Sequence, residues 1–167
     1  MFFSCRRANN GIKVLVYGTA GAGKTSLCGT APSPLIISAE AGLLSLRGKQ
    51  IPVIKVSNIA EVIEALAWCR TDAKKNGIQT ICLDSISEIA EQCLVDQKKK
   101  SKDPRAAYGD MTTVMIDLVK DFRDLQGFNV LVTAKQAIIV EPITNVNKAV
   151  PTAPGQQIGP ALPYLFD

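Results

Sequence analysis

The chain has 167 residues, of which 47% are apolar, 5% aromatic and 20% charged, a composition typical of a folded soluble domain and unlike that of a disordered chain. This length suits one α/β domain that buries a core of its own. The net charge of +4 and the isoelectric point near 8.8 permit an anionic partner without identifying one.

Several classes of function are excluded or disfavoured by residues that the chain lacks. It has no histidine, which rules out Ser-His-Asp and Cys-His catalysis and histidine-ligated metals. No run of about 18 apolar residues and no secretory signal occurs, so we expect a cytoplasmic protein with no membrane contact. The cysteines show no metal-binding spacing, and we expect buried, reduced thiols at four of them: Cys28, Cys69, Cys82 and Cys93.

The first predicted strand leads directly into a glycine-rich motif. Residues 12–17 form a short apolar run, and residues 18–25 follow as Gly-Thr-Ala-Gly-Ala-Gly-Lys-Thr. This octapeptide matches the phosphate-binding pattern G-x-x-x-x-G-K-[ST] at every fixed position, and a helix is predicted from about Lys24. A glycine-rich turn that ends by chance in Lys-Thr is the alternative, but strand, loop and helix follow in the order that phosphate binding requires.

Each part of this loop suits a nucleoside triphosphate. Glycines let the backbone curl tightly and aim several N–H groups at an anion. Lys24 is expected to reach the β- and γ-phosphates, and the Thr25 hydroxyl to ligate Mg²⁺. The predicted contacts to ATP are therefore the loop and the residue after it: Gly18, Thr19, Ala20, Gly21, Ala22, Gly23, Lys24, Thr25 and Ser26.

Two further strands and a capped helix follow. Residues 35–39 form an apolar run that ends at Glu40, an acid at the place where ligands bind in parallel sheets. Residues 51–56 form a third short strand, and the proline within it favours the sheet edge. Asn58 with Glu61 three residues later predicts the capping box of the next helix.

The fourth predicted strand, residues 78–83, runs into Asp84. A buried strand that ends in an acid, placed after a phosphate-binding loop, is typical of nucleotide-binding sheets, in which the acid faces the Mg²⁺ sphere, often through water. We therefore predict that Asp84 and Thr25 belong to one metal site. A strand ending in aspartate without any such role is the alternative.

The helix after Asp84 ends in a basic run. Five basic side chains occur within residues 98–105: Lys98, Lys99, Lys100, Lys102 and Arg105. Two interpretations stay open for them. Cations are favoured at a solvated helix C-terminus, and basic residues followed by Tyr108 also suit a contact with nucleic acid.

The last third of the sequence predicts a helix, a strand and a long loop. Residues 111–125 carry a helical apolar stripe, and residues 128–134 form the fifth core strand, which ends at Gln136. Residues 142–159 are rich in Pro, Gly, Asn, Thr and Gln, and a long loop is expected there. Residues 162–166 are expected to begin another strand, so the domain is expected to be incomplete at its C-terminus.

Strands alternating with helices predict one domain over the whole chain, a three-layer α/β/α sandwich of the P-loop NTPase class with a mostly parallel sheet. The order of the motifs resembles the ATPase core of the RecA family: the glycine-rich loop, a strand ending Ser-Ala-Glu at Glu40, a strand ending at Asp84 and a strand ending at Gln136. Over about residues 11–167 the chain is most similar to short phage-encoded RecA-like single-strand annealing proteins, the Sak group.

The resemblance implies a role for each motif. It implies that Glu40 positions or activates the attacking water and that Gln136 senses the γ-phosphate. Lys24 is the third residue expected to take part in catalysis. The alternative for Glu40 is an acidic residue at the start of a helix, and the alternative for Gln136 is a solvated residue at the end of a strand. The resemblance also places the strand of Gln136 between those of Gly18 and Asp84.

The same resemblance implies partners. They are single-stranded DNA, further copies of the chain and a single-strand DNA-binding protein, in phage recombination or annealing within the bacterial cytoplasm. Residues 98–110 and 137–160 are expected to be mobile and to contact DNA. Lys148 is the only charged donor in the loop expected after Gln136, so single-strand binding regulated by ATP is expected rather than strand exchange.

Two other functions fit the glycine-rich loop. A small P-loop phosphotransferase such as a nucleotide kinase has similar size, but such kinases usually need an arginine-bearing lid, and after Arg70 the chain contains only Arg105 and Arg123. A module that holds nucleotide structurally with little turnover is the other alternative. Glu40→Gln would leave such a module unaffected.

Overall fold

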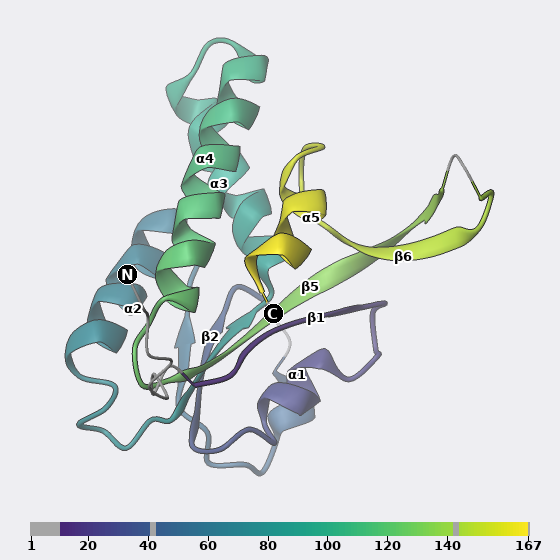
Figure 1. Ribbon diagram of the computed structural model, residues 1–167. Coiled ribbons are helices and arrows are strands. Elements are labelled where there is room, and N and C mark those ends of the chain that lie inside the picture. Colours follow the sequence, from purple (N-terminus) through teal and green to yellow (C-terminus); the bar gives the residue numbers. More distant parts are fainter. Residues whose placement is uncertain (1–10, 41–42, 142–143, 167) are drawn as a thin grey trace, which may run out of the picture.

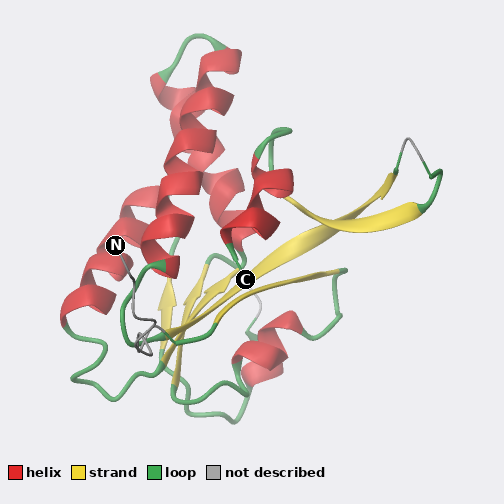
Figure 2. Ribbon diagram, viewed as in Figure 1, coloured by secondary structure: helices red, strands yellow, loops and turns green. Residues whose placement is uncertain are grey.

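The computed structural model describes residues 11–40, 43–141 and 144–166, which form a six-stranded sheet with helices on both faces (Figures 1 and 2). The strands are β1 (Lys13–Gly18), β2 (Pro34–Ser38), β3 (Val53–Lys55), β4 (Thr80–Asp84), β5 (Asn129–Val140) and β6 (Asn147–Thr152). The helices are α1 (Lys24–Cys28), α2 (Ile59–Thr71), α3 (Ile86–Lys100), α4 (Pro104–Arg123) and α5 (Ile158–Ala161), and 3₁₀ turns cover Leu44–Leu46 and Leu162–Leu165.

The sheet is parallel except at one edge. Its order is β1-β5-β4-β2-β3, every pairing along this path is parallel, and β6 pairs antiparallel with β5. The strand that carries Gln136 therefore lies between those of Gly18 and Asp84, as expected, and β3 lies at an edge, as its proline predicted. Because the carboxyl ends of parallel strands meet at one edge, the polar residues that follow these strands gather there.

Alternate side chains of the central strands enter two cores of unequal size. In β2, Leu35 and Ile37 pack in a large core with α2, α3 and α4, whereas Ile36 packs in a small core with Cys28 of α1 and Leu46. This is the two-residue period of a strand that is buried on both faces. The predicted three-layer sandwich with a mostly parallel sheet is confirmed, with one thick helical layer and one thin one (Figure 1).

The long helices begin at side-chain caps. Asn58 Oδ1 accepts a hydrogen bond from the Glu61 backbone N–H at 3.0 Å, and the Glu61 carboxylate accepts one from the Ser57 N–H at 2.6 Å, so the predicted capping box is confirmed. Ser85 caps α3, and Asp103 caps α4. Within the described ranges, no helix combines the length and the apolar character needed to cross a membrane.

The C-terminal part departs from the sequence prediction. The long loop predicted over 142–159 is wrong at Asn147–Thr152 and from Ile158 onward, because β5 continues beyond Gln136 and pairs with β6, and α5 follows. Pro151 is tolerated in β6 because an edge strand needs no N–H donor on its open side. The strand expected at 162–166 is also wrong, since a 3₁₀ turn with a proline near its start covers Leu162–Leu165.

Four thiols are buried and free, as the sequence predicted: Cys28, Cys69, Cys82 and Cys93. Burial raises the pKa of the Cys69 thiol to about 12. Hydrogen bonding to Cys82, together with burial, raises the pKa of the Cys28 thiol well above its usual range. The Cys28 and Cys69 thiols therefore stay protonated and act as small apolar side chains. Cys5 lies outside the described residues.

Asn58→Ala is expected to lower the free energy of unfolding by about 1 kcal/mol, because the Glu61 N–H at the start of α2 loses its acceptor. Urea denaturation would measure the change, with Glu64→Ala on the exposed face of the same helix as the control. Equal effects of the two substitutions would show that the cap contributes nothing beyond helix propensity.

Candidate active site

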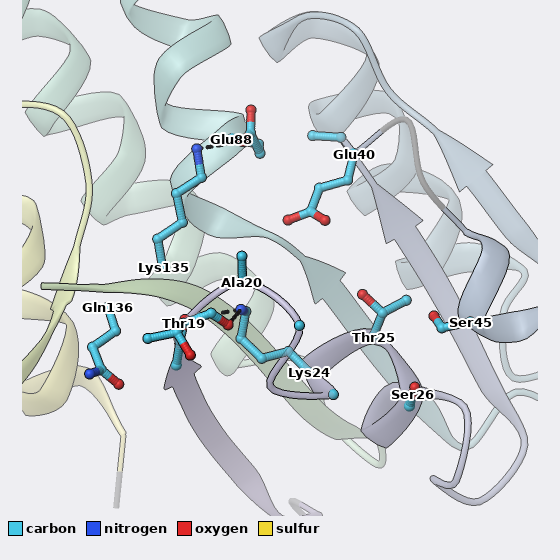
Figure 3. A pocket seen from close by; sticks show the side chains of 14 residues that line it. Thr19, Ala20, Lys24, Thr25, Ser26, Glu40, Ser45, Glu88, Lys135 and Gln136 are labelled. Atoms are coloured by element: carbon cyan, nitrogen blue, oxygen red, sulfur yellow. Dashed lines mark hydrogen bonds and ion pairs between the residues drawn. The ribbon is translucent and has the colours of Figure 1, made fainter.

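A cavity of about 860 Å³ opens at the carboxyl ends of the central strands (Figure 3). The glycine-rich loop after β1 forms its floor, and residues after β2, residues within β5 and the first turn of α3 form its walls. Its lining comprises Gly18, Thr19, Ala20, Gly21, Gly23, Lys24, Thr25, Ser26, Ala39, Glu40, Ser45, Glu88, Lys135 and Gln136. Eight of the nine predicted loop contacts therefore line one cavity with Glu40 and Gln136; Ala22 faces a neighbouring hollow.

The loop needs glycine at two positions. Gly21 and Gly23 have φ values of 75° and 88°, in the left-handed region that other residues rarely adopt. A side chain at either position would meet no atom within 4 Å, so the constraint is the backbone conformation rather than crowding. The open space around both glycines leaves the loop backbone accessible from the cavity.

Lys24 lies folded over this loop. Its Nζ donates hydrogen bonds to the carbonyl oxygens of Gly18 at 3.0 Å and Thr19 at 2.9 Å. An ammonium group has three donors, so the side chain keeps the capacity to bond an anion in the cavity. A phosphate would compete for it on favourable terms, because charge-assisted hydrogen bonds are stronger than those to neutral carbonyls.

Asp84 connects the loop to the sheet. Its carboxylate is fully buried at the end of β4, and each oxygen accepts one short hydrogen bond. Thr25 Oγ1 of α1 donates to Oδ2 at 2.6 Å, and Thr133 Oγ1 of β5 donates to Oδ1 at 2.6 Å. Sequence reasoning missed Thr133, whose position on the strand next to Asp84 follows only from the sheet order.

The donor set fits a magnesium ion that is bound mainly by phosphates and water. Because the Thr25 hydroxyl donates its hydrogen bond to Asp84, the lone pairs of its oxygen remain available to bind a cation. None of the ion pairs among the described residues involves Asp84, so a nearby cation would offset the cost of this buried carboxylate. No cluster of three or more acidic or cysteine side chains occurs in the described ranges, and Mg²⁺ needs no such cluster beside a triphosphate.

Glu40 and Gln136 lie on opposite sides of the cavity (Figure 3). Glu40 follows β2, where its backbone N–H donates to Ser38 Oγ at 3.2 Å, and its half-buried side chain points into the cavity. Gln136 lies within β5, one residue beyond the point where Lys135 is paired with Gly18 of β1. The structure thus brings the predicted water-activating acid, the predicted sensor and the loop together around one space.

A lysine with two acidic partners also lines this region, and the sequence analysis assigned it no role. Lys135 Nζ makes ion pairs with Glu88 Oε1 at 2.5 Å and with Glu91 Oε1 at 2.7 Å, both on α3. Hydrogen bonds to Glu88 and then Glu91 raise the pKa of Lys135, so it is charged at neutral pH. The sequence feature that could have pointed to Lys135 was its position directly before Gln136. Ser45, near the start of the 3₁₀ turn, had none.

The predicted DNA-binding residues lie outside this cavity. Lys98, Lys99, Lys100, Lys102 and Arg105 are exposed around the α3–α4 connection, and the Lys98 ammonium lies 5.3 Å from the centre of the Tyr108 ring. Lys148 is exposed on β6, in a hairpin that projects separately from this helical tip (Figure 1). The structure therefore does not gather Lys148 with the other five, and the mobility expected for 98–110 and 137–160 stays a prediction.

The family model described as "AAA domain" matches residues 10–167, which includes every element of the site. The chain belongs to this family. It is an AAA-type P-loop ATPase domain, and this membership indicates nucleotide binding and hydrolysis at the glycine-rich loop. No curated protein matches the chain.

Thr133→Val is expected to lower the free energy of unfolding by about 1–3 kcal/mol, because one oxygen of the buried Asp84 loses its donor. Chemical denaturation at neutral pH would measure the loss. Thr113→Val on the exposed side of α4 makes the same chemical change at a solvated position and should stay within about 0.5 kcal/mol of wild type. Similar values for both variants would contradict a stabilising role of the Asp84 hydrogen bond.

Proposed function

We propose that this domain is a Mg²⁺-dependent ATPase of RecA type whose nucleotide state controls its binding to single-stranded DNA. The observation that carries the proposal is the position of Glu40 and Gln136 on opposite sides of the cavity formed by the phosphate-binding loop. A carboxylate and an amide so placed supply a base for water and a group that distinguishes triphosphate from diphosphate.

In the proposed site, Lys24 and the loop backbone bind the phosphates. Thr25 and Asp84 are the residues that would hold Mg²⁺, with the Thr25 oxygen toward the ion and Asp84 fixing the hydroxyl by accepting its proton. When bound there, the ion would neutralise part of the phosphate charge. Glu40 accepts a proton from the attacking water, and Gln136 donates to a γ-phosphate oxygen, a bond that is broken on hydrolysis.

The architecture offers a direct route from the site to a DNA-binding segment. Gln136 lies inside β5, so the hairpin formed by β5 and β6 is a continuation of the strand that carries the proposed sensor. A change in the contacts of Gln136 therefore acts on an element that runs out of the nucleotide site. The basic residues at the α3–α4 connection are the proposed source of phosphate-backbone attraction.

The partners follow from the same proposal. They are single-stranded DNA, further copies of this chain and a single-strand DNA-binding protein, during phage recombination or annealing in the cytoplasm of a bacterial host. The resemblance of the motif series to the Sak group supports this assignment.

A nucleotide kinase is less well supported. Arg105 lies at the start of α4 and Arg123 is paired with Asp124 at its end, and neither lines the cavity. No arginine among the described residues lines the cavity, so this part of the chain supplies no arginine clamp of the kind that such enzymes place over the transferred group.

Steady-state ATP hydrolysis with Mg²⁺ tests the catalytic part. Lys24→Ala is expected to abolish nucleotide binding and hydrolysis, whereas Glu40→Gln should still bind nucleotide and lose about 100-fold or more in kcat, the usual contribution of a general base. Glu64→Gln removes an acid from the exposed face of α2 and serves as the control. Unchanged turnover in Glu40→Gln would exclude Glu40 as the base.

Binding of a fluorescent single-stranded oligonucleotide, measured over a range of salt concentrations, tests the DNA part. Replacing Lys98, Lys99 and Lys100 with glutamine is expected to reduce the magnitude of the negative slope of log K against log salt by about two. Each phosphate charge neutralised by a lysine accounts for about 0.7 of that magnitude. A variant with the same reduction of charge elsewhere, in Lys74, Lys75 and Lys120, should keep the slope. An equal decrease in both variants would show that only net charge matters.

A further inference from the structure

Lys135 occupies a position that the proposed mechanism does not use. It is the last residue of β5 paired with β1, opposite Gly18 at the beginning of the phosphate-binding loop. Its side chain lines the same cavity as Lys24, is 41% exposed, and points to Glu88 at the cavity wall (Figure 3). Lys24 and Lys135 are the two lysines that line this cavity among the described residues.

The backbone of Lys135 is fixed while its ammonium group is free to exchange partners. Pairing with Gly18 holds the strand, and the Lys135 backbone N–H donates to the buried Ser87 Oγ at 2.8 Å. By contrast, both carboxylate partners are accessible to water, with Glu91 47% exposed. Ion pairs between such exposed groups contribute little to stability, so the Lys135 ammonium group loses little free energy when it leaves the two carboxylates.

We propose that Lys135 is a second phosphate-contacting lysine, which leaves Glu88 and Glu91 and binds the terminal phosphate when a nucleoside triphosphate occupies the site. This inference rests on the proposed nucleotide function of the cavity. A γ-phosphate offers three strong acceptor oxygens on one group, and Lys135 turns toward it by rotating a flexible four-carbon side chain. A diphosphate ends short of this wall, so the ammonium group stays with Glu88 and Glu91.

The exchange reports the nucleotide state to a second element. Ser87, which accepts the hydrogen bond from the Lys135 backbone, donates to the carbonyl oxygen of Thr152 in β6 at 2.7 Å. One side chain of α3 thus joins the strand of Lys135 to the end of the β5–β6 hairpin. When Lys135 leaves α3, the polar connection between α3 and β5 on the cavity side is reduced to this Ser87 bridge, on which the hairpin position then depends.

The test compares the affinity for a non-hydrolysable ATP analogue with that for ADP, both with Mg²⁺, by calorimetry. Lys135→Gln is expected to weaken analogue binding about tenfold, as the removal of one charge-assisted hydrogen bond predicts, and to change ADP binding less than about twofold. Lys135→Arg should recover much of the discrimination. Lys120→Gln removes an exposed lysine paired with an aspartate on α4 and should alter neither affinity.

A second variant separates this role from a merely structural one. Glu91 does not line the cavity but competes for Lys135, so Glu91→Gln is expected to strengthen analogue binding relative to ADP. The two substitutions thus have opposite effects on the ratio of the two affinities. If Lys135 only anchors α3, both substitutions lower or preserve the two affinities together.

The outcomes are distinct. Equal decreases for analogue and ADP in Lys135→Gln, or weaker analogue binding in Glu91→Gln, would overturn the role of Lys135 and leave the proposed ATPase intact. Failure of the wild-type protein to bind either nucleotide would overturn the proposed function and this inference together. Thermal unfolding without nucleotide, compared between the variants and wild type, identifies any decrease in affinity that comes from a damaged fold.

Discussion

The buried carboxylate of Asp84 is the constraint on which the site depends. It lies at the end of a strand that is covered on both faces, and its two oxygens accept 2.6 Å hydrogen bonds from Thr25 and Thr133. Those donors come from the helix after the phosphate-binding loop and from the neighbouring strand. Because a buried carboxylate without partners is costly, the three elements can hold it only in one relative arrangement. The depth of the loop against the sheet is set in this way before any ligand binds.

The order of the strands determines which side chains surround the cavity. Since β5 lies between β1 and β4, the residues after Val132 pass between the loop and Asp84 before they leave the sheet. As a result, Thr133 donates a hydrogen bond to Asp84, Lys135 forms ion pairs with the acidic residues of α3, and Gln136 lines the cavity. With β5 at an edge of the sheet, the same residues would contact neither the loop nor α3. Topology, more than any single contact, therefore selects which side chains surround the phosphate position.

Sequence reasoning succeeded where a local rule has a strong physical cause. The phosphate-binding loop, the capping box at Asn58 and the buried strand before Asp84 each depend on residues close in sequence, and all three were located correctly. It failed for the β5–β6 hairpin, because β6 contains Asn, Pro and Thr and has no alternating apolar pattern, and the register of the hairpin is set by strand pairing rather than by composition. The Thr133 and Lys135 contacts escaped prediction because they join residues 44 to 49 positions apart.

The hairpin limits how DNA could be held in the proposed function. Its exposed apolar side chains, Ile138, Ile139, Val140 and Val146, are unsuited to bind phosphates, and Lys148 is the only basic residue in 137–157. Under that proposal, most of the electrostatic attraction for DNA would come from the α3–α4 connection, and the apolar side chains of the hairpin would contact bases or another protein surface. The proposed DNA affinity and its control by nucleotide would thus be divided between two elements. Helix α3 joins them, because its C-terminal end carries Lys98, Lys99 and Lys100 and its N-terminal turn carries Ser87 and Glu88. Nucleotide-dependent DNA binding in this domain would therefore require α3 to act as a rigid connection between both ends.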